Sequence, residues 1–127
     1  MAKKVMIVDD EISIIELLTM ILSSSGYEVV STVKALDSII LAHNEMPELI
    51  ILDYKMPGMD GINVLKGLRA SHMTKHIPIV FVTGNKTPEL YQRIKENNAL
   101  DIITKPFSSQ EIISICEQAI GPAIELA

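Results

Sequence analysis

The sequence predicts a three-layer α/β domain, in which helices cover both faces of a parallel sheet. The first observation is a set of four apolar runs: Val5–Val8, Leu49–Leu52, Ile77–Val82 and Leu100–Thr104. Runs that are apolar at nearly every position are typical of parallel strands, because these strands are buried on both faces. The second observation is that stretches with helical spacing separate the runs, so strands and helices alternate. Right-handed crossovers then leave few topologies.

The first half of the chain is expected to hold three strands and two helices. After the first apolar run, residues 10–25 carry apolar side chains at helical spacing, and Gly26 is suited to the C-cap. Residues 27–31 are expected to form a short strand at the sheet edge. A second helix over residues 35–46 should end at Pro47, which leads into the third strand.

The second half is expected to add two strands and three helices. Asp60 is placed to cap the third helix, and the fourth should start near Pro88, a residue suited to a first helical turn. The remaining two apolar runs supply the fourth and fifth strands. Ser108 or Ser109 should cap the fifth helix, which is expected to run to about Ile120.

Composition limits the classes of function. The 127 residues suffice for one domain with a sizeable core, expected over residues 1–121, with residues 122–127 as a C-terminal tail or linker stub. A formal net charge of −5, with no basic cluster longer than Lys3-Lys4, argues against nucleic acid or an anionic membrane as a partner. One cysteine, Cys116, cannot form an internal disulfide, and no signal peptide is visible. A cytoplasmic protein is therefore expected.

Chemically useful side chains follow the strands of the predicted sheet. Asp9 and Asp10 follow the first strand, and Asp53 follows the third. Thr83 ends the fourth strand and Lys105 follows the fifth. In open parallel sheets, ligands bind just beyond the carboxyl ends of the strands. We therefore expect all five side chains to lie at one rim.

Three carboxylates, one ammonium and one hydroxyl at a rim indicate phosphoryl transfer. Clustered carboxylates repel one another, and Lys105 offsets only one of the charges. Mg²⁺ binds through one or two carboxylates and completes its shell with water and phosphate oxygens, so it is suited to offset the two remaining negative charges. An aspartate can itself be the nucleophile and form an aspartyl phosphate. Thr83 and Lys105 would then act as donors to the phosphoryl oxygens.

The motifs at this rim resemble those of response-regulator receiver domains of the CheY-like type. The resemblance extends from Lys4 to about Ile120, with the motifs in the family's order. They are Asp9-Asp10, Asp53-x-x-Met56-Pro57-x-Met59-Asp60-Gly61, Thr83-Gly84 and Lys105-Pro106-Phe107. The resemblance implies a doubly wound (βα)5 flavodoxin-like fold with the parallel sheet order 2-1-3-4-5.

The resemblance also implies how the acidic residues act. Asp53 is expected to accept a phosphoryl group from a histidine kinase or a histidine phosphotransfer protein. Asp9, Asp10 and Asp53 are expected to hold Mg²⁺, with Mn²⁺ as a substitute, and Lys55 to add its backbone carbonyl. Lys55 and Asn85 flank the site and are expected to tune the lifetime of the phosphoryl group.

Two further residues are expected to link phosphorylation to a change of shape. Thr83 matches the switch hydroxyl that moves to the phosphoryl group. Lys105 matches the lysine that pairs with this group, and its bond to Pro106 is expected to be cis. Family members often carry Tyr or Phe three residues before this lysine, where this chain has Ile102. Switching should therefore depend on Thr83 and the loop that follows it.

The expected output surface is formed by the fourth helix, the fifth strand and the fifth helix. Tyr91, Ile94 and Lys95 on the fourth helix, together with Ile102, are where a downstream output protein or domain would read the change. The sequence leaves open a stand-alone regulator or a receiver cut from a longer chain with a separate output domain. Another alternative is an aspartyl-phosphate phosphohydrolase, although such enzymes commonly need a second acid where this chain has Lys55. A flavin-binding electron carrier lacks support, because no Ser/Thr/Gly-rich phosphate loop follows the first strand.

Overall fold

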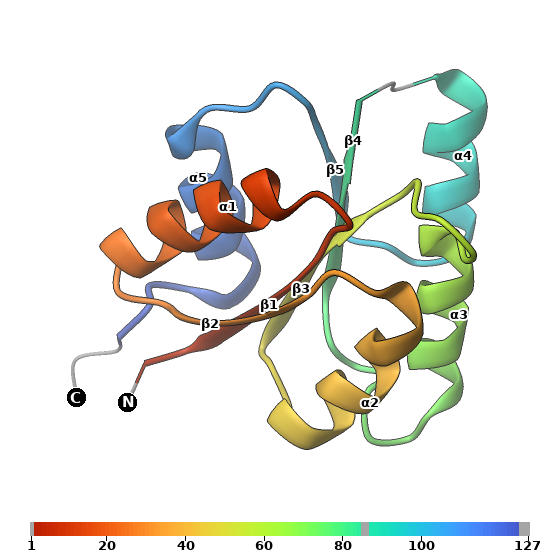
Figure 1. Cartoon of the computed structure of the whole chain (residues 1–127), viewed down its shortest axis with the longest axis horizontal. Helices are drawn as coiled ribbons and strands as arrows, with labels where there is room; N and C mark the ends of the chain where they lie inside the picture. The colour runs from red at the N-terminus through yellow and green to blue at the C-terminus, as the bar shows by residue number, and fades with distance from the viewer. Residues whose placement is uncertain (1, 85–86, 125–127) are drawn as a thin grey trace.

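The structure is a computed structural model, which describes residues 2–84 and 87–124. In this part of the chain five strands and five helices alternate strictly (Figure 1). The elements are β1 (Lys4–Val8), α1 (Ile12–Ser24), β2 (Glu28–Thr32), α2 (Ala35–Glu45), β3 (Leu49–Asp53), α3 (Gly61–Ala70), β4 (Ile79–Thr83), α4 (Pro88–Glu96), β5 (Asp101–Thr104) and α5 (Ser109–Ile120). Among the described residues, no helix combines the length and the apolar character needed to cross a membrane.

The five strands form one parallel sheet in the order β2-β1-β3-β4-β5. This confirms the predicted fold class and strand order. Strands β3 and β4 are buried at every position, whereas β2 at the edge is only partly covered, as its mixed sequence predicts. Strand β4 begins at Ile79 rather than at the predicted Ile77, because Pro78 has no amide hydrogen to give to the ladder. The Pro78 carbonyl still accepts a hydrogen bond from the Ile50 amide, at 3.0 Å.

Two hydrophobic cores lie on opposite faces of the sheet. One contains Met6 and Val8 and is covered by α2, α3 and α4. The other contains Val5 and Ile7 and is covered by α1 and α5 (Figure 1). Successive residues of β1 thus point to opposite faces, as a strand requires. The three layers explain why the apolar runs show no polar alternation.

Three helices start with a side-chain cap, and these starts lie on the side of the sheet where the strands end. The Asp60 carboxylate accepts the amide of the third residue of α3, and the Thr87 hydroxyl does the same for α4. Helix α4 begins at Pro88, as predicted. Ser108 and Glu111 form a reciprocal capping box at the start of α5. Each cap satisfies amides that the first turn leaves without a partner, so it fixes where the preceding loop enters the helix.

The chain beyond α5 packs back onto the N-terminal end of β1. The Lys3 amide donates to the carbonyl of Ala123 at 2.8 Å, and the Tyr27 hydroxyl donates to the carbonyl of Gly121 at 2.8 Å. Ala123 is buried in the core under α1 and α5. The two ends of the described chain therefore meet at the amino ends of the strands, away from their carboxyl rim (Figure 1). Residues 125–127 of the expected tail are outside the described part of the chain.

Candidate functional site

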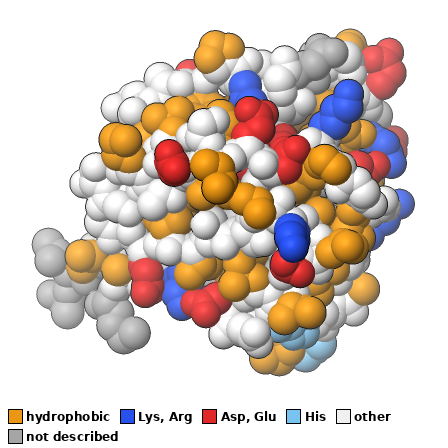
Figure 2. Space-filling model, in the orientation of Figure 1, with side chains coloured by type: hydrophobic (Ala, Val, Ile, Leu, Met, Phe, Trp, Pro, Cys, Tyr) orange, Lys and Arg blue, Asp and Glu red, His pale blue; other side chains and the backbone are white. Residues whose placement is uncertain are grey.

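The carboxyl ends of β1 and β3 bring three aspartates together. One carboxylate oxygen from each of Asp9, Asp10 and Asp53 lies within 4.8 Å of the others. Asp9 and Asp53 are 2% and 6% exposed, whereas Asp10 is open to solvent. Figure 2 shows acidic side chains gathered near the centre of the view, among hydrophobic ones. Oxygen ligands with one side open to water suit a hard cation such as Mg²⁺, which keeps part of its hydration shell.

Lys105 lies among these carboxylates at the end of β5. Its ammonium nitrogen is 3.4 Å from Oδ2 of Asp9 and 3.6 Å from Oδ1 of Asp53. It also lies 3.8 Å from Oε1 of Glu11, a partner that the sequence did not single out. The peptide bond from Lys105 to Pro106 is cis, as the resemblance implied. The structure thus places Lys105 beside the predicted acidic cluster.

The electrostatics of the rim favour a further positive charge. Burial, and then the neighbouring charge of Asp9, raise the pKa of Asp53 to about 7, although Lys105 acts in the opposite direction. Burial also raises the pKa of Asp9. For Lys105, burial lowers the pKa, but the negative charges of Asp53, Asp9 and Glu11 together more than offset this, and its pKa is raised. One lysine therefore leaves the rim short of positive charge, which a divalent cation would supply.

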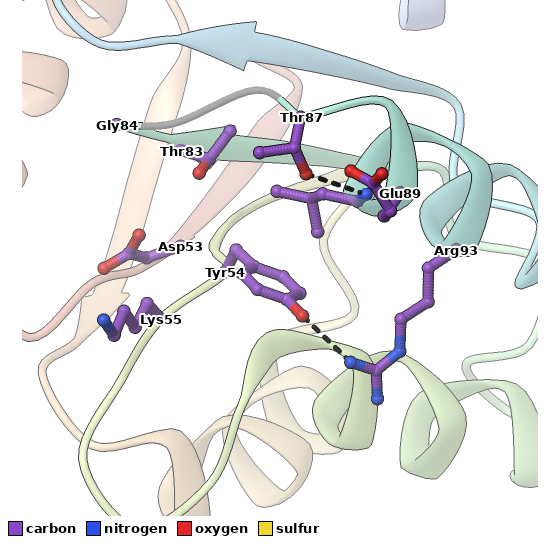
Figure 3. Close-up of a pocket in the computed structure, with 9 residues that line it drawn as sticks. Asp53, Tyr54, Lys55, Thr83, Gly84, Thr87, Glu89 and Arg93 are labelled. Atoms are coloured by element: carbon purple, nitrogen blue, oxygen red, sulfur yellow. Dashed lines mark hydrogen bonds between the residues drawn. The ribbon is translucent and has the colours of Figure 1, made fainter.

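Beside the acidic cluster lies a cleft of about 450 Å³ between the end of β3 and the start of α4 (Figure 3). Thr83 is buried at the end of β4 and lines this cleft together with Asp53. Lys55, two residues after Asp53, also lines the cleft and is exposed. Asn85, which was expected to flank the site, is outside the described residues. The full set of described lining residues is Asp53, Tyr54, Lys55, Thr83, Gly84, Thr87, Glu89, Leu90 and Arg93.

Tyr54 and Arg93 form a contact across this cleft that sequence reasoning missed. The ring of Tyr54 packs edge-on against Phe81, with ring centres 6.2 Å apart. Its hydroxyl accepts a hydrogen bond from Nη1 of Arg93 at 3.0 Å, drawn in Figure 3. Nη2 of Arg93 lies 3.8 Å from Oδ2 of Asp60. An aromatic residue next to Asp53 was a visible signal, but nothing in the sequence identified its partner 39 positions later.

Gly61 allows the loop after Asp53 to fold back closely under the site. Its amide donates to the Tyr54 carbonyl at 2.7 Å. A Cβ at this position would lie 2.8 Å from the carbonyl oxygen of Asp53 and 2.6 Å from the ring of Phe81. Both distances are shorter than any side chain tolerates, so only glycine fits here.

The structure corrects the expected output surface at two positions. Ile94 and Ile102 are 1% and 7% exposed and belong to the core between the sheet and helices α2 to α4. Ile94 is buried because it lies one turn after Leu90, on the stripe of α4 that faces the sheet. Tyr91 and Lys95 are exposed, with the Lys95 ammonium 5.3 Å from the centre of the Tyr91 ring. Tyr91 and Lys95 are therefore accessible on the surface of α4, whereas the two isoleucines are not.

The five-stranded parallel fold and its acidic rim define the class of CheY-like signalling domains. The model of the response regulator receiver domain matches residues 5–117. The chain belongs to this family, so it is a phosphorylatable receiver domain.

Relatives in this family differ in length. The phosphate regulon transcriptional regulatory protein PhoB of Escherichia coli is 37% identical over 115 residues, which cover 90% of this chain and 50% of PhoB. This chain thus spans about half the length of the PhoB relatives it matches. The sporulation initiation phosphotransferase F of Bacillus subtilis is 34% identical, covering 88% of this chain and 89% of that protein. Among solved structures, the chemotaxis protein CheY4 of Vibrio cholerae superimposes with a TM-score of 0.90 at 29% identity, over 94% of this chain and all of that one.

Proposed function

We propose that Asp53 is the phosphoryl acceptor of this receiver domain, and that its phosphorylation switches the binding of a partner. The observation that carries this proposal is the cluster of three carboxylates with the Lys105 ammonium beside two of them. Asp9, Asp10 and Asp53, with the backbone carbonyl of Lys55, would hold Mg²⁺, and Mn²⁺ would substitute because it prefers the same oxygen ligands. When bound, the cation compensates the charge that develops on the phosphoryl oxygens.

In this proposal a carboxylate oxygen of Asp53 attacks the phosphorus of a phosphohistidine on a histidine kinase or phosphotransfer protein. The phosphorus–nitrogen bond breaks, the imidazole leaves and takes up a proton, and an acyl phosphate forms. Lys105 stays within reach of the new group and pairs with one of its oxygens. The Thr83 hydroxyl, which lines the same cleft, donates to another.

The switch would act through the segment that follows Thr83. A phosphoryl group offers several strong acceptors, so it can draw the Thr83 hydroxyl inward and move the chain that leads to α4. The exposed residues Tyr91 and Lys95 on α4, with the outer face of α5, would then present a changed surface to an output protein or domain. We propose that the domain catalyses only its own phosphorylation and dephosphorylation. We also propose that it acts in the cytoplasm.

Two arrangements of the whole protein fit this role. A stand-alone regulator agrees with the relatives of similar length, such as the polar-differentiation response regulator DivK of Brucella ovis, which is matched over its full length. A receiver that precedes an output domain agrees with PhoB, of which this chain matches half. The boundary of the receiver near residue 121 stays a prediction in both.

The test is phosphorylation of the purified chain by acetyl phosphate, followed by intact mass measurement. We expect one phosphoryl group per chain with Mg²⁺, none in excess chelator, and none in Asp53→Asn. The matched control is Asp37→Asn, because Asp37 is an exposed aspartate in the first turn of α2. This variant should be phosphorylated like the parent. A full adduct in Asp53→Asn would move the acceptor elsewhere, and turnover of a generic phosphate ester would instead favour a phosphohydrolase.

A further inference from the structure

Arg93 fastens the middle of α4 to the segment that follows Asp53. Its guanidinium donates to the Tyr54 hydroxyl at 3.0 Å and lies 3.8 Å from the Asp60 carboxylate. Tyr54 is the residue directly after Asp53, and Asp60 caps α3. Figure 3 shows the Arg93 side chain reaching from α4 across to the Tyr54 ring. One side chain thus joins α4 to both ends of the β3–α3 loop.

This contact spans the same cleft that the phosphoryl group would enter. Asp53 and Thr83 line the cleft together with Thr87 and Arg93. Thr87 caps α4, because its hydroxyl accepts an amide of the first turn at 3.1 Å. A displacement of Thr83 should therefore move the N-terminal end of α4. Arg93 restrains the same helix further toward its C-terminal end.

At the position where many receivers carry an aromatic residue, this chain has a side chain that can make no polar contact. Ile102 is buried in the core and has neither a ring nor a hydroxyl. Among the described residues that line the cleft, Tyr54 is the aromatic one, and it lies next to the acceptor. A connection from the site to α4 is thus available through Tyr54 and Arg93.

We propose that Arg93 is a positioning residue that holds α4 in its resting place through Tyr54 and Asp60, and that phosphorylation of Asp53 releases it. This inference rests on the proposed role of Asp53. A contact that exists only in the resting state lowers the population of the state that binds the phosphoryl group best. The Arg93 side chain is 49% exposed, so the contact is weak and its loss should shift the equilibrium about three- to tenfold.

The test is a titration of the whole chain with beryllofluoride in the presence of Mg²⁺. Binding is monitored through the amide resonances. Arg93→Gln and Tyr54→Phe should each tighten the apparent Kd for beryllofluoride by about three- to tenfold. The double variant should gain no more than Arg93→Gln alone, because Arg93→Gln already removes the contact that Tyr54→Phe removes, together with the Asp60 pair. Lys66→Gln removes the same charge from an exposed site on α3 and should bind like the parent.

Chemical shifts separate a positioning role from a general loss of stability. Without beryllofluoride, the amides of α4 in Arg93→Gln and Tyr54→Phe should move part of the way toward their positions in the bound parent. Tyr54→Phe removes a single oxygen atom, so it carries the test if Arg93→Gln fails to fold. The inference is overturned if both variants bind within twofold of Lys66→Gln, or if their unliganded amides stay at the parent positions. If the parent binds no beryllofluoride, the proposed role of Asp53 fails instead.

Discussion

The ionised Asp53 carboxylate is costly to hold at the rim when no metal is bound. Burial, and then the neighbouring charges of Asp9 and Asp10, raise the pKa of Asp53 to about 7. Lys105 reduces the repulsion without removing it. The residues of the rim were predictable from sequence, because strand ends of a parallel sheet converge on one edge. The Tyr54–Arg93 contact was not, because it depends on how α4 lies across the sheet.

Removing the Asp53 charge should stabilise the metal-free protein at high pH. The raised pKa means that the unfolded chain loses this proton near pH 4 and the folded chain near pH 7, so the parent loses stability as the pH rises between the two. Above pH 7 the full cost is on the order of 2–4 kcal/mol. In chelator at pH 8, Asp53→Asn should melt roughly 7–15 °C above the parent, and the gap should close near pH 4. Thermal melts that run parallel at both pH values would rule this out.

Asp10 should contribute mainly to metal affinity, because it is exposed and its loss disturbs no core contact. Mg²⁺ that binds only the folded parent raises its melting temperature by mass action. Asp10→Ala should lose most of this increase while melting close to the parent in chelator. Glu11→Gln, a change at the exposed neighbour that pairs with Lys105, is the control and should keep the increase. An equal response to Mg²⁺ in Asp10→Ala and the parent would exclude Asp10 as a ligand.

At the scale of elements, the strand ends, the helix caps and one glycine fix the geometry of the site. Strand and helix bounds could be predicted to within about two residues, because the apolar periodicity is strong and Pro78 and Pro88 mark two starts. Which residues of a helix are buried was harder to predict. The sequence predicts Ile94 at the output surface, but the side chain is buried because docking of α4 on the sheet sets its helical phase.

Gly61→Ala should destabilise the fold and distort the site together. The added methyl would press on the backbone oxygen of Asp53, which cannot rotate away as a side chain end could. Overpacking of this kind costs about 1–3 kcal/mol, measurable by urea unfolding. Gly84→Ala is the control, because a Cβ there meets no heavy atom within 4 Å. Equal unfolding midpoints for the two variants would mean that the loop can relax around the methyl group.

At the scale of the whole molecule, the site and the two ends of the described chain lie at opposite ends of the sheet. The segment after α5 is fastened to Lys3 and Tyr27 at the amino ends of the strands. A change at the rim can therefore reach α4 without loosening this end. The two-core architecture favours such local change, because α4 covers only one face and α1 and α5 stabilise the other.

Beryllofluoride should shift amide resonances from α4 to β5, and leave β2 and α2 nearly unchanged. The physical reason is that the Thr83 hydroxyl moves toward the bound beryllofluoride, which displaces the start of α4. Thr83→Ala should bind the mimic but lose the shifts in α4, whereas Thr83→Ser keeps the hydroxyl and should keep them. Shifts confined to β2 and α2, or normal shifts in Thr83→Ala, would contradict this route.

If the proposed function is right, Asp53 itself carries the phosphoryl group. The most direct measurement phosphorylates the chain with acetyl phosphate and Mg²⁺, reduces the acyl phosphate with borohydride, and sequences the peptides by mass spectrometry. Reduction converts a phosphorylated aspartate into homoserine, which marks the acceptor permanently. We expect homoserine at position 53 alone. Homoserine at position 9 or 10, with Asp53 unmodified, would contradict it.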